Sequence, residues 1–178
     1  MAAGDSLLGS YSPESMVIVL SKGDFVHTIQ GYADGTFLNI SRLTPASELY
    51  VGSDLSAGRV KRRNKASTIT ITLHQFSPSN AVLQALQRAD EEDDRDEWVF
   101  SITIKDLSGT GVWSSRAAFV ATNPDTTFSN TTETRDWMIQ AISLSANIGS
   151  NTYFDAAEVA AMAALDTEVP ARWQLGDQ

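Results

Sequence analysis

The sequence contains no cysteine, so neither a disulfide nor a thiolate metal site holds the fold together. It also lacks any apolar run that approaches the roughly 18 residues of a membrane span. Residues 1–15 have no basic segment and no long apolar segment, and we expect no signal peptide there. Positive charge is scarce, since 13 Lys and Arg against 22 Asp and Glu give a formal net charge of -9. Tight binding of nucleic acid needs a positive field, so this balance argues against it and suits a surface that DNA passes without sticking.

Histidine is equally scarce, and the two in the chain, His27 and His74, both lie within strand-like patterns. Two imidazoles on neighbouring strands need a third ligand and supporting hydrogen bonds to hold a metal ion, and the sequence marks neither. The glycines of residues 107–111 (LSGTG) lack the strand-to-helix context of a phosphate loop and predict a hairpin turn. We therefore expect no enzyme, no metal and no cofactor. A small β-barrel enzyme stays open as an alternative, and it requires both imidazoles to face one cavity.

Strand patterns dominate the 178 residues, which are enough for one domain with its own core. The clearest is residues 68–74 (TITITLH), where large aliphatic side chains alternate with threonines up to His74. A period of two indicates a strand with one buried face, so Ile69, Ile71 and Leu73 are expected to face the core. Further strands are predicted at residues 16–20, 25–31, 37–43, 98–106, 112–121 and 134–148. A turn signal at Asp34-Gly35 predicts that the first three of these form an antiparallel meander.

Between these strands, residues 46–67 show little periodicity, and we interpret them as a long functional loop. A helix is predicted after Ser77 and Pro78, which suit a cap and a first helical position. Its apolar face consists of Val82, Leu83, Leu86 and Ala89. A second, short and Ala-rich helix has the capping-box spacing of Asp155 and Glu158, and it needs to dock on something to be ordered.

The pattern as a whole predicts a mainly β fold, an antiparallel sandwich or barrel with one flanking α-helix. We expect residues 1–151 to form this domain and residues 152–178 to form a C-terminal extension with a short helix.

Two clusters of opposite charge interrupt the pattern. The basic cluster consists of Arg59, Lys61, Arg62, Arg63 and Lys65. The acidic cluster consists of Asp90, Glu91, Glu92, Asp93, Asp94, Asp96 and Glu97. Each is either a solvated stretch or one side of a contact. Because the clusters are complementary to each other and not to themselves, a contact between copies would be head-to-tail and would build rings or filaments.

Four stretches carry a resemblance to a known family. They are residues 11–43, with its ADG turn, residues 58–86, with TITITLH followed by SPSN, residues 100–111, with IKDLSG, and residues 134–151. In this order they resemble the tail tube proteins of contractile-tailed bacteriophages and, more distantly, the tube protein of type VI secretion systems. The resemblance implies a β-sandwich protomer with a flanking helix, which forms hexameric rings that stack into a tube. It also implies one continuous barrel around a lumen, a sheath outside it, and tape-measure protein and later DNA inside.

The resemblance offers an interpretation of the threonine row. If each copy adds about four strands, about 24 strands at roughly 4.8 Å spacing and a tilt near 45° enclose a bore of about 40 Å, wide enough for a duplex about 20 Å across. A polar bore without positive charge lets phosphates slide, so we expect Thr68, Thr70 and Thr72 to face the lumen. The alternation alone fits the outer face of a sandwich equally well.

The sequence thus predicts a structural, self-assembling subunit of a phage tail tube that conducts DNA during ejection. Its expected partners are further copies of itself and the sheath, tape-measure, baseplate and terminator proteins, with DNA only in transit and no membrane insertion. We expect it in the virion, after assembly in the host cytoplasm. A β-sandwich binding module of the baseplate or carbohydrate-binding type stays open, and it predicts a monomer or small closed oligomer with an exposed aromatic patch.

Overall fold

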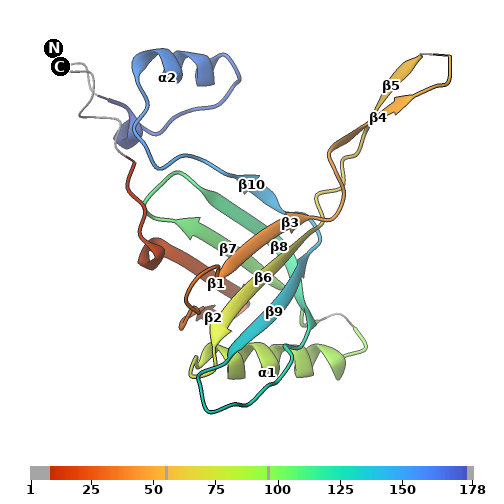
Figure 1. Cartoon of the computed structure of the whole chain (residues 1–178), viewed down its shortest axis with the longest axis vertical. Coiled ribbons are helices and arrows are strands. Elements are labelled where there is room, and N and C mark those ends of the chain that lie inside the picture. Colours follow the sequence, from red (N-terminus) through yellow and green to blue (C-terminus); the bar gives the residue numbers. More distant parts are fainter. Residues whose placement is uncertain (1–8, 55, 96, 176–178) are drawn as a thin grey trace. The chain divides into compact units, whose positions relative to one another are not determined.

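The structure is a computed structural model that describes residues 9–54, 56–95 and 97–175 (Figure 1). Its elements in chain order are η1 (Pro13–Ser15), β1 (Met16–Lys22), β2 (Phe25–Thr28), β3 (Leu38–Arg42), β4 (Ser47–Val51), β5 (Ala57–Lys61), β6 (Ser67–His74), α1 (Ser79–Glu91), β7 (Phe100–Asp106), β8 (Val112–Thr122), β9 (Thr134–Ala141), β10 (Ser145–Asn147), α2 (Ala156–Ala163) and η2 (Ala171–Trp173). In the described part of the chain, no helix has the length and apolar character that crossing a membrane requires.

Most strands join one sheet in the order β2-β1-β7-β8-β9-β6-β3, with β10 paired to β8. The β1-β2, β3-β6, β6-β9 and β8-β9 pairs are antiparallel. The predicted mainly β, antiparallel fold with a flanking helix is therefore confirmed.

The chain divides into two compact units, which we describe separately. Unit 1 comprises the described residues within 1–17, 105–112 and 147–178, and unit 2 comprises the described residues within 18–104 and 113–146. Unit 1 thus contains both the β7-β8 turn and the described part of residues 152–178, which we call the C-terminal segment. The predicted domain boundary after residue 151 stays a prediction.

The core of unit 2 is built from alternating strand positions. In β6 burial alternates without exception, so that Ile69, Ile71 and Leu73 are fully buried and the threonines between them are partly exposed. Strands β7 and β9 repeat this alternation. The other large side chains of the unit that are at most 5% exposed are Ile18, Leu20, Ile29, Leu83, Leu86, Phe100, Ile102, Ile104, Val120, Trp137, Ile139 and Leu144. The predicted burial of the aliphatic face of β6 is confirmed.

Helix α1 lies across one end of β6 and β9 (Figure 1). There the Trp137 indole donates to Asn80 Oδ1 at 2.8 Å, and the Asn80 amide donates to the His74 carbonyl at 3.0 Å. The helix begins one residue later than predicted, with Pro78 as its N-cap, and Ser77 Oγ accepts from the Ser79 N–H at 3.2 Å. Buried Leu83 and Leu86 confirm its apolar face.

The predicted meander is wrong in its second half. Strands β1 and β2 do form a hairpin, but β3 pairs with β6 at the other end of the sheet. The connecting residues bond to the end of β6: Ala33 N–H donates to the Thr72 carbonyl at 3.0 Å, and His74 N–H donates to the Gly31 carbonyl at 3.1 Å. Gly35 takes its φ of +84° in a bend on this path, so a local turn signal did not imply a local hairpin.

The predicted loop of residues 46–67 is also wrong, because most of it is a two-stranded hairpin of β4 and β5. Leu49 lies opposite Arg59, and Tyr50 lies opposite Gly58. All five residues of β5 and four of the five of β4 are exposed. A ribbon that is wet on both faces has no buried side, so its sequence does not alternate between apolar and polar residues.

The predicted single strand at residues 134–148 is interrupted as well. It forms β9 and β10, and Leu144 between them is 4% exposed and donates its N–H to the Lys65 carbonyl at 3.0 Å.

Candidate functional site

The row of Thr68, Thr70 and Thr72 lies on the face of β6 opposite the core. Its cross-strand neighbours are Ser41 and Asn39 on β3 and Gln140, Met138 and Asp136 on β9. Of these, Met138 is 37% exposed. We call these eight residues the polar sheet face. It carries one carboxylate and no lysine or arginine, so it is a wet, uncharged to weakly acidic surface across three strands.

The two ends of the sheet are strands with a single partner each. In the order of the described strands, β2 pairs only with β1, and β3 pairs only with β6. An edge strand presents unpaired N–H and C=O groups that a strand of another chain can meet. The β3 edge borders the polar sheet face directly.

All members of the basic cluster are exposed. Arg59 and Lys61 lie in β5, and the others follow it on the way to β6. Arg62 Nη2 lies 2.8 Å from Glu48 Oε2 in the paired strand β4, in an ion pair that is about half exposed. Such an exposed pair contributes about 0–1 kcal/mol, so it fixes the ribbon only weakly.

The acidic cluster begins in the last turn of α1 with Asp90 and Glu91 and continues beyond the helix. Asp93 accepts hydrogen bonds from the N–H groups of Arg95, at 3.0 Å, and Glu97, at 2.6 Å, while Asp96 lies outside the described residues. Negative charge at a helix C-terminus opposes the helix dipole, so the acidic cluster does not stabilise α1. Within the described ranges Arg62–Glu48 is the one ion pair, so no salt bridge joins the described members of the two clusters inside a chain.

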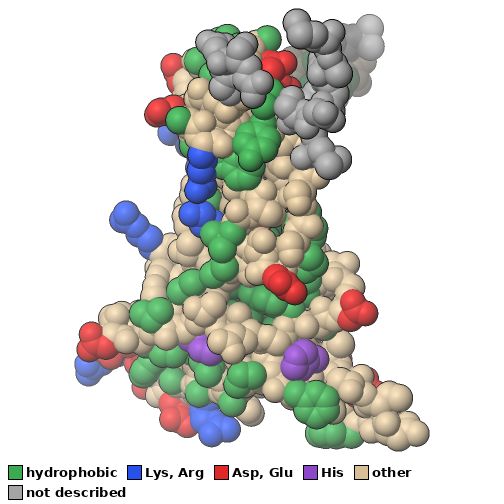
Figure 2. Space-filling model, turned by 90° about the vertical axis from the view of Figure 1, so that its left-hand side faces the viewer, with side chains coloured by type: hydrophobic (Ala, Val, Ile, Leu, Met, Phe, Trp, Pro, Cys, Tyr) green, Lys and Arg blue, Asp and Glu red, His purple; other side chains and the backbone are tan. Residues whose placement is uncertain are grey.

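The two histidines occupy separate places, and Figure 2 shows them as two distinct surface patches. His27 Nε2 lies 2.9 Å from Ser79 Oγ, and burial lowers the pKa of His27 below its usual value of 6.5. His74 Nδ1 is buried and has no hydrogen-bond partner among the described residues. No group of three His, Asp or Glu side chains among residues 9–54, 56–95 and 97–175 is placed to hold a metal ion.

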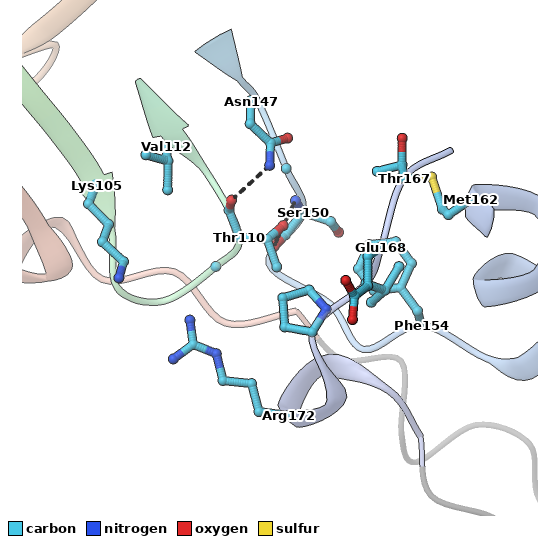
Figure 3. A pocket seen from close by; sticks show the side chains of 14 residues that line it. Lys105, Thr110, Val112, Asn147, Ser150, Phe154, Met162, Thr167, Glu168 and Arg172 are labelled. Atoms are coloured by element: carbon cyan, nitrogen blue, oxygen red, sulfur yellow. Dashed lines mark hydrogen bonds between the residues drawn. The ribbon is translucent and has the colours of Figure 1, made fainter. Parts of the chain in front are cut away.

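A cavity of about 460 Å³ in unit 1 was not predicted from the sequence (Figure 3). Its walls come from the β7-β8 turn, the residues after β10 and the C-terminal segment. The apolar lining is Val112, Phe154, Met162, Val169 and Pro170, and the charged lining is Lys105, Glu168 and Arg172. These residues lie far apart in the sequence, so no local motif marks the cavity.

Glycine and hydrogen bonds hold the cavity wall together. Gly149 has a φ of +67°, and a Cβ there would lie 2.5 Å from the Gly111 nitrogen, so only glycine fits. The Thr110 N–H donates to the Ser150 carbonyl at 3.0 Å, and the Ser150 N–H donates to Thr110 Oγ1 at 2.9 Å.

Next to this wall, Asp106 is 7% exposed. Burial raises the pKa of its carboxyl, but hydrogen bonds from the Ser108 hydroxyl, the Asn151 amide and the Ser108 N–H outweigh burial and hold the pKa below its ordinary value. The charged Asp106 carboxylate therefore connects the β7-β8 turn, through Ser108, to the segment after β10, through Asn151.

The C-terminal segment closes the cavity from the other side. The Phe154 N–H donates to the Trp173 carbonyl at 2.8 Å, and the Leu175 N–H donates to the Phe154 carbonyl at 2.9 Å. Helix α2 carries the predicted capping box, in which Asp155 accepts from the Glu158 N–H at 2.8 Å and Glu158 accepts from the Asp155 N–H at 2.9 Å. The box is confirmed, yet no residue of α2 is buried.

Comparison with known sequences decides the family. The profile of the bacteriophage PhiTE tail tube protein matches residues 16–149. The chain belongs to this family of phage tail tube proteins. The resemblance predicted from the sequence is thereby confirmed, and the chain is a structural subunit of a phage tail tube and a component of the virion.

One relative of known sequence agrees with this assignment. The chain is similar to structural protein ORF10 of Pseudomonas phage KPP10, with 32% identity over 166 residues that cover 92% of this chain and 96% of that protein. A chain from the tube-terminating cap of the anti-feeding prophage has 16% identity and a TM-score of 0.50, over 83% of this chain and 99% of its own length. A chain from the extended PVC sheath-tube complex, an extracellular contractile injection system, has 15% identity and a TM-score of 0.49, over 78% of this chain and 92% of its own length. At 16% identity, the likeness to the chain of the tube-terminating cap concerns the fold alone.

Proposed function

We propose that copies of this chain form hexameric rings that stack into a hollow tube, and that the polar sheet face lines a bore through which DNA passes during ejection. The observation that carries this proposal is the strict alternation of β6, which gives one strand a fully buried aliphatic face and a wet face without positive charge. Phosphates slide along such a face because it offers them no cation to bind.

The sheet supplies the strands that a continuous barrel needs. Strands β8, β9, β6 and β3 are consecutive in the sheet, and β3 ends it with an unpaired edge. Four strands from each of six copies give about 24 strands and a bore of about 40 Å. The outer face of a sandwich remains the competing assignment for the threonines.

We further propose that the basic cluster of one copy meets the acidic cluster of another. The basic cluster is exposed, and so are Glu91, Glu92, Asp94 and Glu97 of the acidic cluster. Most described members of both clusters have no ion-pair partner among the described residues, and the acidic cluster opposes the dipole of the helix that bears it. Opposite charge steers docking and sets register more than it adds affinity. Each pair contributes little by itself, but a ring and a stack of rings repeat it many times.

Electron microscopy of the purified, negatively stained chain tests the assembly. Rings or tubes with a central bore of about 40 Å are expected. A chain that stays monomeric at high concentration would refute the tube and would favour a β-sandwich binding module.

Charge reversal tests the contact between clusters. Arg62 and Asp93 are avoided, because each has a structural role within its own chain. Reversing Arg59 and Arg63 to Glu is expected to block tube growth without changing the far-UV spectrum. Arg88→Glu, exposed on α1 and outside both the basic cluster and the strands of the proposed barrel, is the control.

Two further results belong to this test. Reversing Glu92 and Asp94 to Lys in the Arg59/Arg63 variant is expected to restore part of the assembly. Salt near 1 M, where the screening length is about 3 Å, is expected to weaken growth of the wild-type tube. Full assembly of the Arg59/Arg63 variant would show that the clusters are only solvated surfaces.

We propose the remaining partners from the family resemblance: a sheath outside the tube, tape-measure protein inside it during assembly, and terminator and baseplate proteins at its ends. Assembly takes place in the host cytoplasm, and the chain has no catalytic role. The relatives are structural and tail tube proteins, which supports the absence of a catalytic role.

A further inference from the structure

A positive charge is buried on the core face of β9. Burial alternates along this strand, and Arg135 takes the first core-facing position, before Trp137 and Ile139. Arg135 is 9% exposed, and it forms no ion pair with any described carboxylate. Moving a charge out of water costs free energy unless the charge is paired and hydrogen-bonded. Packing of the core therefore does not explain an arginine at this position.

Contacts within the chain satisfy the Arg135 guanidinium only in part. Its Nη1 donates to the Thr134 carbonyl at 3.1 Å, and its Nη2 donates to the Thr127 carbonyl at 3.3 Å. The centroid of the Phe128 ring lies 5.5 Å from Arg135 Cζ, in a cation–π contact. A guanidinium has five N–H donors, so three of them have no hydrogen-bond partner among the described residues.

Arg135 lines a pocket in unit 2 whose chemistry suits an anion. The pocket has a volume of about 550 Å³ and lies between α1 and residues 123–133, the connection from β8 to β9 (Figure 1). Of its lining residues Arg135 alone is charged, and Gln75, Gln84 and Asn123 add amide groups that can donate hydrogen bonds. A guanidinium held in place matches the two oxygens of a carboxylate with two parallel N–H groups. We call this site the Arg135 pocket.

Two phenylalanines at the Arg135 pocket are left in water. Phe128, which lines the pocket, is 84% exposed, and Phe76, between the lining residues Gln75 and Ser77, is 70% exposed. A small free ion would occupy the polar part of the pocket but would cover neither ring. Aromatic side chains with this much exposed surface are typical of protein interfaces. The site therefore suits a protein segment that presents a carboxylate beside an apolar side chain.

We propose that the Arg135 pocket binds an Asp or Glu side chain of a partner protein in the assembled tail. The carboxylate accepts hydrogen bonds from the Arg135 guanidinium and the amide side chains around it, and apolar side chains next to the carboxylate cover Phe76 and Phe128. This bond supplies the counter-charge that the chain itself does not give to Arg135. The proposal does not depend on which face of the sheet lines the bore.

Small carboxylates test the site on the purified chain, at protein concentrations too low for assembly. The probes are sodium acetate and sodium hydrocinnamate, each compared with sodium chloride at the same ionic strength. Both are expected to raise the midpoint of thermal unfolding above its value in chloride. Hydrocinnamate is expected to act at lower concentration, because its phenyl ring also covers a phenylalanine. A ligand at ten times its dissociation constant raises the midpoint of a chain of this size by about 3–6 °C.

Two variants assign the effect to the Arg135 pocket. Arg135→Met removes the charge and is expected to abolish the rise in midpoint with both probes. Gln84→Glu adds a negative charge to the lining at an exposed position of α1, so it is expected to fold and to reduce the rise. Asn39→Asp adds the same charge at an exposed position of β3 outside the pocket and is the matched control, with the full rise expected. Equal midpoints in chloride and in the carboxylates, or an undiminished rise in Gln84→Glu, would overturn the carboxylate site.

Phages that carry Arg135→Met or Gln84→Glu test the partner. Loss of tube formation by the purified variants, in comparison with the wild-type chain, would show that a second copy of this chain supplies the carboxylate. Normal tubes combined with a loss of complete tails would show that another tail protein supplies it. Complete tails and infectious phage at the wild-type yield would overturn the proposed partner. The probe experiment needs no tube, so its result is independent of the proposed function.

Discussion

The two faces of β6 predict opposite responses to truncation, and Ile71 with its neighbour Thr70 provides the comparison. Ile71 is fully buried and lies between Leu38 on β3 and Trp137 on β9. Ile71→Ala removes three carbons from the core, which is about 2.4 kcal/mol at about 0.8 kcal/mol for each. The cavity left behind adds to this, so we expect a loss of about 2–5 kcal/mol in the free energy of unfolding.

Thr70→Ala is the matched control, one position along the same strand on the wet face. It leaves no cavity in the core, so its cost is limited to strand propensity, at most about 1 kcal/mol. Urea unfolding followed by far-UV circular dichroism, at concentrations too low for assembly, measures both values. In thermal unfolding the Ile71→Ala loss corresponds to roughly 4–20 °C.

A result in which both variants lose the same stability would refute the division into a core face and a wet face. So would a larger loss for Thr70→Ala, because it would place the threonine row in a packed interior. Either outcome would also remove the observation on which the proposed bore depends.

Three other predictions follow from particular positions. Thr70→Lys is expected to leave the monomer folded but to slow DNA release from a phage that carries it, and ejection at the normal rate would argue against a bore kept free of positive charge. Gly149→Ala is expected to destabilise unit 1 in thermal unfolding, since its Cβ would lie 2.5 Å from the Gly111 nitrogen. Gly35→Ala is the control, because its Cβ meets no atom within 4 Å and the variant bears only the strain of its positive φ. Equal losses of stability in the two variants would contradict the prediction. Because burial lowers the pKa of His27, the unfolded chain binds the proton more readily than the folded chain. The free energy of unfolding is therefore expected to fall as the pH drops below about 6.5. His27→Gln is expected to weaken this pH dependence, measured by urea titrations at several pH values.

Local signals predicted several elements correctly. The period of two in residues 68–74 placed Ile69, Ile71 and Leu73 in the core, because a strand has only two faces and one of them was entirely aliphatic. The spacing of Asp155 and Glu158 predicted the capping box, since that motif lies within four consecutive residues. The family also followed from the order of such elements along the chain.

Pairings between distant strands were not predictable in the same way. The Asp34-Gly35 signal suggested a hairpin, but the preceding residues bond to the end of β6, which lies about forty residues further along the chain. The β4-β5 hairpin was missed because both of its faces are exposed, so no buried side imposed a pattern on the sequence.

By itself, the sequence determined the class of fold, the core face of β6, the position of α1 and the two charge clusters, because each depends on neighbours along the chain. Only the tertiary structure decided that β3 ends the sheet beside the polar sheet face, that Arg62 pairs with Glu48, and that a cavity lies between the β7-β8 turn and the C-terminal segment. These features join residues far apart in sequence. Their pairing is selected by the burial of the whole core and by backbone hydrogen bonding across the sheet, and no local pattern records that selection.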